Sequence, residues 1–170
     1  MPQATALQAD LGIDAFLSLT TKRAGKAKGE ATAVGHAGDI TVVGWRWGMN
    51  ASSALGSTQA TTRRSYSALT IVKRVDQATT AILSAAATND EVKEAKLTLR
   101  RAGGSQVDFL TVTVSAGRIV SVEHESDPDG GTRETLGIAF TKVQVEYAPQ
   151  QASGSRGGTA VFNDELPTNT

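Results

Sequence analysis

Two histidines are the side chains best suited to acid–base or metal chemistry in this chain, and neither has the partners that such chemistry needs. His36 and His124 are the only histidines among 170 residues. His36 precedes Asp39 by three residues and could in principle share a metal ion with it, but two ligands do not make a site. A loop histidine that hydrogen-bonds the next strand is the favoured interpretation. We therefore predict no metal site.

The sequence also lacks a nucleophile prepared for catalysis. There is no cysteine, and no Gly-x-Ser-x-Gly motif presents a serine on a sharp turn. Asp127, Asp129 and Gly130 resemble the start of a calcium loop, but Pro128 interrupts them and no glutamate stands at the twelfth position. We predict a tight turn there, no cofactor and no enzymatic activity. A hydrolase using His36 or His124 is the alternative of the enzyme class.

The charges do not indicate a polyanionic partner. Lysine plus arginine and aspartate plus glutamate both total 17, so the formal net charge is zero. The basic cluster within residues 22–28 has no interleaved aromatic residue on which a base could stack. No apolar stretch approaches the roughly 20 residues of a membrane helix, and residues 1–12 do not form a signal peptide. We predict no nucleic-acid binding, no membrane insertion, and export, if any, without a cleavable signal.

The hydrophobic pattern alternates in many short segments, which is typical of strands that bury one face. One helix is predicted at 79–88, with Thr79 as its N-cap. The predicted strands are 14–20, 39–48, 66–75, 95–101, 107–114, 118–123, 133–147 and 159–162. About eight strands with one helix favour two packed antiparallel sheets or a small barrel.

The chain is long enough for one domain with a single core. Residues 1–13 show neither a helical nor a strand period and are expected to form a flexible arm, residues 14–163 the β domain and 164–170 a tail. Residues 22–38 are predicted to be a loop because glycines interrupt them. Met49 to Ser65 has almost nothing to bury and is too long for an ordinary hairpin turn, so it is a candidate functional loop or a disordered segment.

Trp45, Arg46 and Trp47 are the most distinctive triplet in the chain. On a strand, Trp45 and Trp47 share one face and Arg46 takes the other. Two large aromatic residues on one side are expected to anchor a core between sheets. Arg46 must then face water, a neighbouring subunit or a ligand.

From about Asp14 to Phe162 the sequence resembles the hemolysin-coregulated protein (Hcp) family, which forms the tube of bacterial type VI secretion. The matching segments occur in the family's order and are Asp14 to Leu17, His36 to Gly48, Leu69, Lys73 and Asp76, Lys93 to Leu110, and Glu134 to Gln150. Gly44, Asn163 and the first thirteen residues depart from the usual pattern.

The resemblance implies a compact β-barrel of two sheets flanked by one helix. It also implies hexameric rings that stack into a tube inside a contractile sheath, act with a spike protein, and are expelled into target cells with effector proteins in the lumen. Assembly would take place in the bacterial cytoplasm. A phage or phage-like tail tube subunit of the same fold is the alternative.

Two sets of residues are candidates for function within such a tube. The loop from Met49 to Ser65 is a candidate ring-to-ring contact in which Arg63 and Arg64 pair with charges across the stack, unless it is simply disordered. Arg46 is a candidate lumen-facing, cargo-contacting residue, because alternation turns it away from the two tryptophans.

Overall fold

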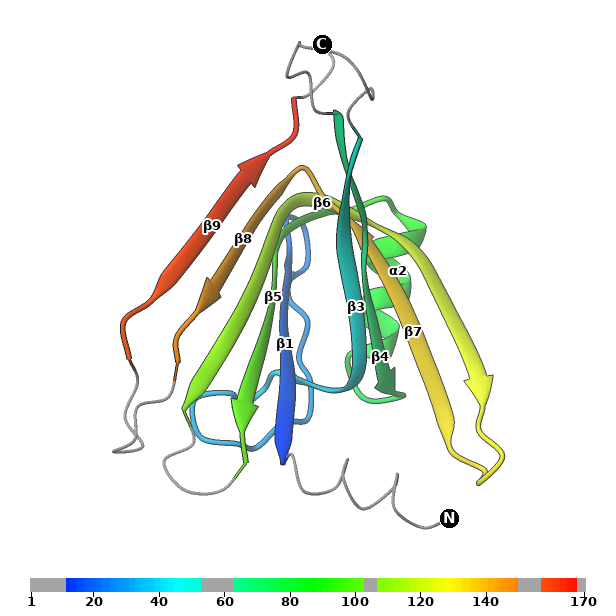
Figure 1. The fold of residues 1–170 in the computed structure, drawn as a ribbon. Helices are drawn as coiled ribbons and strands as arrows, with labels where there is room; N and C mark the ends of the chain where they lie inside the picture. Colours follow the sequence, from blue (N-terminus) through cyan, green and yellow to red (C-terminus); the bar gives the residue numbers. More distant parts are fainter. Residues whose placement is uncertain (1–11, 53–62, 103–106, 150–156, 168–170) are drawn as a thin grey trace, which may run out of the picture.

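A computed structural model describes residues 12–52, 63–102, 107–149 and 157–167 of the chain. This part of the molecule, drawn in Figure 1, forms nine strands and one helix. Their bounds are β1 (Ile13–Thr21), β2 (Gly25–Lys26), β3 (Ile40–Ser52), β4 (Arg63–Arg74), α2 (Thr79–Ala87), β5 (Glu91–Arg101), β6 (Asp108–Ser126), β7 (Thr132–Ala139), β8 (Lys142–Tyr147) and β9 (Ala160–Glu165). The predicted fold class, mainly β with one helix, is confirmed.

The strands close into an irregular barrel through antiparallel pairs. The closed circuit runs β1–β3–β4–β7–β6–β5 and returns to β1. Strands β8 and β9 extend the sheet from β6, and β2 adds two residues beside β1. Two layers result, because β6 pairs with β5 and β8 along its first half and with β7 along its second half. Most of the core lies between these layers.

Strand β6 corrects the prediction of two separate strands at 107–114 and 118–123. The segment from Ser115 to Gly117 has turn-like composition, but it bends one 19-residue strand without reversing it. Ala116 takes a positive φ of 51° at the bend. A Cβ at Gly117 would lie 2.1 Å from the carbonyl oxygen of Ala139, so only glycine lets the two backbones approach this closely.

The helix α2 packs one face into the core, with Ile82 and Ala85 buried. Thr79 is not its N-cap as predicted: Ala78 holds that position without a side-chain cap. The carboxylate of Asp76 accepts a hydrogen bond from the Ala78 backbone N–H at 2.9 Å. The Thr79 hydroxyl instead donates a hydrogen bond to buried Glu134 at 2.9 Å, and the threonine side chain is therefore buried in the core.

The predicted loop from Met49 to Ser65 is wrong at both ends. Backbone pairing continues from Met49 opposite Tyr66 to Ser52 opposite Arg63, so β3 and β4 extend well beyond their hydrophobic parts. The ladder stabilises residues that have little to bury. The middle of the predicted loop, 53–62, lies outside the described residues, as do residues 1–11 of the predicted arm.

The predicted boundary at residue 163 also needs correction, because β9 continues to Glu165 along β8. The one helix of the described chain is too short and insufficiently apolar to cross a membrane.

Candidate assembly surfaces

Arg46 lies on an exposed sheet face, on the edge strand β3. The pairing register places it in one row with Thr70 of β4, Gly137 of β7 and Ser121 of β6. All three neighbours have small side chains, and Arg46 itself is exposed. The face therefore leaves the guanidinium free to extend from the sheet, as the alternation of the sequence predicted.

The two tryptophans do not form a buried pair, which corrects their prediction as joint core anchors. Trp47 is partly buried against the core and stacks on Tyr66 with ring centroids 6.1 Å apart. Trp45 lies opposite Ile71, which is fully buried, yet is itself 38% exposed. The physical reason is the edge position of β3: beyond Val42 the described chain places no strand on its other side.

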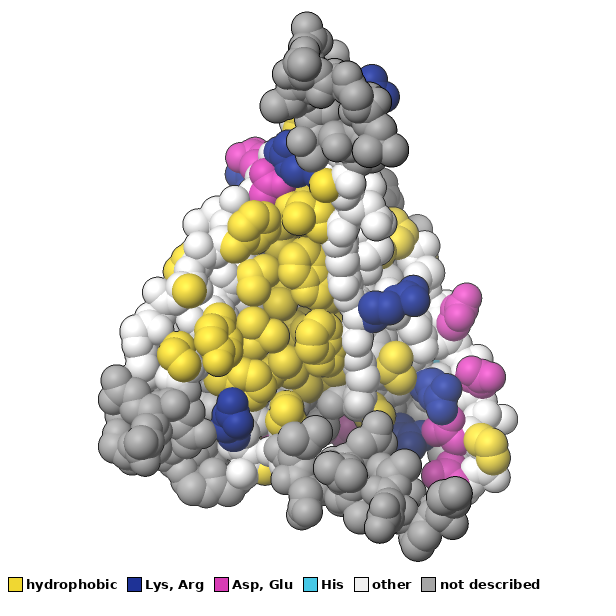
Figure 2. Space-filling model, viewed as in Figure 1, with side chains coloured by type: hydrophobic (Ala, Val, Ile, Leu, Met, Phe, Trp, Pro, Cys, Tyr) yellow, Lys and Arg dark blue, Asp and Glu magenta, His cyan; other side chains and the backbone are white. Residues whose placement is uncertain are grey.

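Trp45 borders an apolar opening between β3 and the β8–β9 pair. Figure 2 shows a continuous hydrophobic area there, beside the exposed backbone of β3. The core-side residues with substantial exposure at its margins are Trp45, Met49, Tyr147 and Phe162. A large exposed apolar patch on a soluble protein marks an interaction surface. The sheets thus leave one side of the core incompletely covered in a single copy.

Arg64 pairs with Asp164 of the same chain. Its guanidinium contacts the Asp164 carboxylate at 2.5 and 2.9 Å, and the Tyr66 hydroxyl donates to the same carboxylate at 2.6 Å. The hydrogen bond from Arg64, followed by that from Tyr66, lowers the pKa of Asp164. Burial, then the bond to Asp164, raises the pKa of Tyr66. Arg63 is exposed and makes no ion pair with the described residues.

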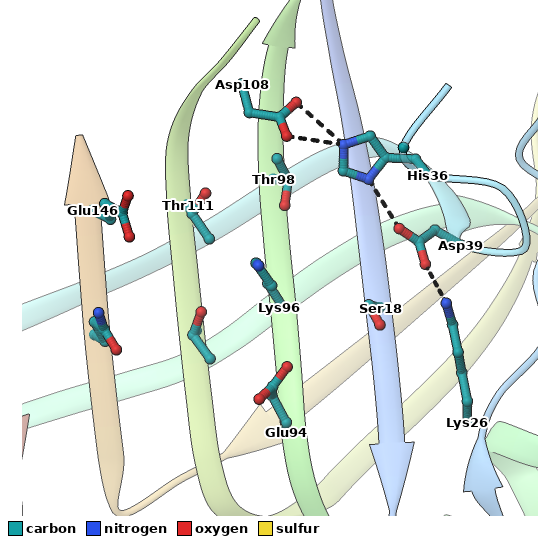
Figure 3. A pocket seen from close by; sticks show the side chains of 13 residues that line it. Ser18, Lys26, His36, Asp39, Glu94, Lys96, Thr98, Asp108, Thr111 and Glu146 are labelled. Carbon is teal, nitrogen blue, oxygen red and sulfur yellow. Dashed lines mark hydrogen bonds and ion pairs between the residues drawn. The ribbon is translucent and has the colours of Figure 1, made fainter. Parts of the chain in front are cut away.

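His36 joins a polar network at one margin of a groove of about 590 Å³ on the outer face of β1, β5, β6 and β8. Its Nδ1 lies 2.9 Å from Asp39 and its Nε2 3.2 Å from Asp108 (Figure 3). The ring stacks on Phe16 with centroids 4.5 Å apart. The histidine thus contacts Asp39, which begins the predicted strand 39–48 and immediately precedes β3.

Among the described residues, no group of three or more His, Cys, Asp or Glu side chains is arranged to hold a metal ion. Asp39 is also bound by Lys26 at 2.7 Å, and Asp108 by Arg100 at 3.0 Å. Two cations and one imidazole therefore already compensate the two carboxylates. The network connects the loop before β3 to β5 and β6, so its role is structural.

The family described as "Type VI secretion system effector, Hcp" matches residues 16–147 of the chain. The chain belongs to the Hcp family. Protein hcp1 of Pseudomonas aeruginosa is 31% identical over 155 residues, covering 89% of this chain and 93% of that protein. This Hcp chain is accordingly a structural subunit of the type VI secretion tube. The match favours secretion over the phage tail alternative.

Solved structures agree in fold. A type six secretion system protein superposes with a TM-score of 0.80 at 24% identity, over 91% of this chain and 96% of its own. Hcp1 from Salmonella typhimurium superposes with a TM-score of 0.74 at 22% identity, and the match covers 91% of this chain and 95% of that one. The predicted barrel with a flanking helix is thereby confirmed.

The Hcp barrel also contains a buried ionic cluster that sequence reasoning did not identify. Lys73 on β4 is fully buried and pairs with the equally buried Glu134 on β7 and, at 2.9 Å, with Asp76 before α2. His124 on β6 lies 3.5 Å from the other Glu134 oxygen. Alternation was the available signal, since Lys73 shares its strand face with Leu69 and Ile71.

Proposed function

We propose that this Hcp chain closes into hexameric rings that stack into a tube inside a contractile sheath, with a spike protein at its end. The tube is expelled from the bacterial cytoplasm into target cells and carries effector proteins in its lumen. The observation that carries the proposal is the apolar opening of the single copy. Family membership supports the assembly, while sheath, spike and effectors follow from the expected mechanism.

The opening explains why a single copy is incomplete. Trp45 and Met49 on one side and Phe162 on the other expose 38 to 49% of their surface on the core side of the sheets. Burying such residues against a neighbour gains hydrophobic free energy, at about 25 cal/mol per Å² of apolar surface. A ring provides every copy with that neighbour.

Electron microscopy and light scattering of the purified protein test the ring. Six-membered rings with an open centre support it, whereas a uniform monomer over the whole accessible concentration range contradicts it. Release into the medium by a host strain, compared with the same strain lacking its sheath, tests expulsion. Equal release by both strains counts against the tube.

Arg46 is our candidate for the lumen wall. Its row contains only small neighbours, so six copies would present a band of guanidinium groups. Such a band would favour acidic patches on a cargo protein. Arg46→Glu should abolish effector capture in a pull-down, with ring content measured in the same sample, whereas Arg23→Glu on an exposed loop should not. Unchanged capture by Arg46→Glu rings contradicts this role.

The described end of the β3–β4 pair, at Ser52 and Arg63, is our candidate for ring-to-ring contact. Of the residues assigned to it, Arg63 stands at the start of β4, exposed and without an ion-pair partner in the described chain. Arg64 already pairs with Asp164, and Met49 lies along the apolar opening. Arg63→Glu should shorten tubes in electron micrographs while single rings persist. Tubes of unchanged length contradict the contact.

We also propose that the chain acts without catalysis of its own. His36 is compensated by Asp39 and Asp108, and His124 by Glu134, so both histidines have structural partners. The double variant His36→Ala/His124→Ala should retain secretion-dependent effects wherever it still folds and assembles. Loss of those effects from intact rings would indicate an enzymatic role.

A further inference from the structure

Strand β9 is attached to the barrel through one backbone ladder. It pairs with β8 from Ala160 opposite Tyr147 to Glu165 opposite Lys142. Its second edge has no partner strand among the described residues. Of its six side chains, only that of Asp164 is partly buried. The ladder therefore fixes β9 relative to β8 but not relative to the opposite layer of the barrel.

A cluster of side chains joins β9 to β4 in that opposite layer. The Asp164 carboxylate binds the Arg64 guanidinium at 2.5 and 2.9 Å and accepts a hydrogen bond from the Tyr66 hydroxyl at 2.6 Å. The Arg64 guanidinium also donates to the backbone carbonyl oxygen of Glu165 at 3.2 Å. Two parallel bonds between a guanidinium and a carboxylate fix orientation as well as distance. We call Arg64, Tyr66 and Asp164 the β4–β9 clasp.

Aromatic packing holds the β4 half of the clasp in place. The Tyr66 ring stacks on Trp47 with centroids 6.1 Å apart and packs against Phe140 with centroids 5.5 Å apart. Phe140 belongs to the buried core, and Trp47 and Tyr66 pack against that core. The Tyr66 hydroxyl therefore extends from a fixed ring toward the Asp164 carboxylate, and the position of β9 is tied to the core of the barrel.

Burial on the core side of β8 decreases with distance from the clasp. Val143, which pairs with Asp164 in the ladder, is 4% exposed, whereas Tyr147 on the same strand is 44% exposed. In Figure 1 the end of β9 approaches the far end of β3 and β4, and its start diverges from them. The apolar area of Figure 2 lies in the space between. The apolar opening is thus a wedge that is closed at the clasp and wide at its other end.

We propose that the β4–β9 clasp sets the width of this wedge before assembly, so that a neighbouring copy meets a preformed surface. This inference rests on the proposed ring, because it takes a second copy as the occupant of the apolar opening. A surface that is already ordered loses less conformational entropy when a partner binds. If the six contacts of a ring are independent, a threefold loss at each becomes a loss of about 700-fold in ring formation.

The clasp should matter more for assembly than for the folding of one copy. The Arg64 and Asp164 side chains are in contact with solvent, and ion pairs at the surface contribute little to the free energy of unfolding. Strand β9 also lies outside the closed circuit of β1, β3, β4, β7, β6 and β5. Loosening the clasp therefore leaves that circuit paired while the margin of the opening moves.

Distance measurements on single copies test whether the clasp sets the width. The chain has no cysteine, so spin labels at Trp45→Cys on β3 and Phe162→Cys on β9 mark the two margins of the opening without background. The labelled protein is measured at a dilution where single copies prevail, with and without Asp164→Asn. We expect a narrow distance distribution with the native aspartate and a broader one, extending to longer distances, with asparagine. Identical distributions overturn the clasp.

Ring formation tests the consequence in chains without labels. Asp164→Asn should raise the concentration of half-assembly at least several-fold in light scattering, with urea midpoints measured in parallel. Arg64→Asp should act in the same way, and its combination with Asp164→Arg should restore assembly, which two independently destabilising changes would not do. Glu91→Gln is the matched control, because it removes an exposed ion pair, with Lys22, that does not border the opening.

The outcomes distinguish the clasp from the ring. A broadened distance distribution with unchanged assembly overturns the role of the preset width, and so does an equal loss of assembly in Glu91→Gln. Wild-type protein that forms no rings overturns the proposed function, whereas the spin-label distances still decide whether the clasp sets the width.

Discussion

Lys73 and Glu134 form an ion pair across β4 and β7 with both side chains fully buried. The Thr79 hydroxyl donates to the same Glu134 oxygen, and Asp76 also contacts the lysine. The cluster fixes the start of α2 to two strands of the barrel. Removing two charges from water is costly, so such a pair contributes to stability only while both partners are present.

Replacing one partner of the Lys73–Glu134 pair should therefore lower the free energy of unfolding much more than replacing both. Lys73→Met leaves Glu134 charged and buried, and we expect the free energy of unfolding to fall by about 3–5 kcal/mol. Lys73→Met combined with Glu134→Leu should recover most of that loss. Urea denaturation of the three proteins measures the difference. Equal loss in the single and the double variant would contradict a dominant cost of the unpaired charge.

The sequence predicts the fold well where buried and exposed residues alternate along a strand. It predicts the fold poorly where pairing with another strand determines the structure. The strand at 95–101 and the end of 133–147 follow from alternation, because Leu97 and Leu99, like Val143 and Val145, are separated by polar residues. The prediction of two strands at 107–114 and 118–123 is wrong, because the composition of the segment between them does not show that β5, β7 and β8 all pair with one bent strand. Met49 to Ser52 became strand only through backbone pairing with β4, which side-chain hydropathy does not report.

The residues of the candidate surfaces also differ in how well the sequence predicts them. Local alternation alone placed Arg46 on an exposed face. It could not place Trp45, whose exposure depends on β3 diverging from β1 after Val42. It could not reveal that Arg64 binds Asp164, because 100 residues separate the two in sequence. Long-range pairs of this kind are determined by topology, and one sequence carries little information on it.

The bond from Arg64 to Asp164 should make stability depend on acid pH. The pKa of Asp164 is lowered in the folded chain, so its contribution is complete above the unfolded value, near 4, and is lost as the pH falls through the folded value. Asp164→Asn should be less stable than the parent protein at pH 6, with the difference shrinking toward pH 2. Unfolding curves at several pH values measure this, with exposed Glu30→Gln as the control. A difference independent of pH would contradict the linkage.

A side chain at Gly117 should destabilise the folded chain. In Gly117→Ala the new Cβ would meet the Ala139 carbonyl oxygen at 2.1 Å, so β6 and the β7–β8 junction must separate. We expect the free energy of unfolding to fall by about 1–3 kcal/mol, as in overpacked cores. Gly158→Ala is the matched control, because a Cβ there meets no atom within 4 Å. Comparable denaturation midpoints for the two variants would show that the bend can relax.

Substitutions at Met49 and Leu69 should distinguish effects on assembly from effects on folding. Leu69 is fully buried in the core, so Leu69→Ala should lower the free energy of unfolding by about 2–5 kcal/mol. Met49 is 49% exposed along the apolar opening, so Met49→Ser should cost the isolated chain less than about 1 kcal/mol. If a neighbouring copy covers the opening, the same Met49 variant should shift the ring equilibrium strongly toward single chains. Light scattering over a dilution series measures that shift. A Met49→Ser protein that assembles as the parent does would mean that the opening is covered by something other than a second copy.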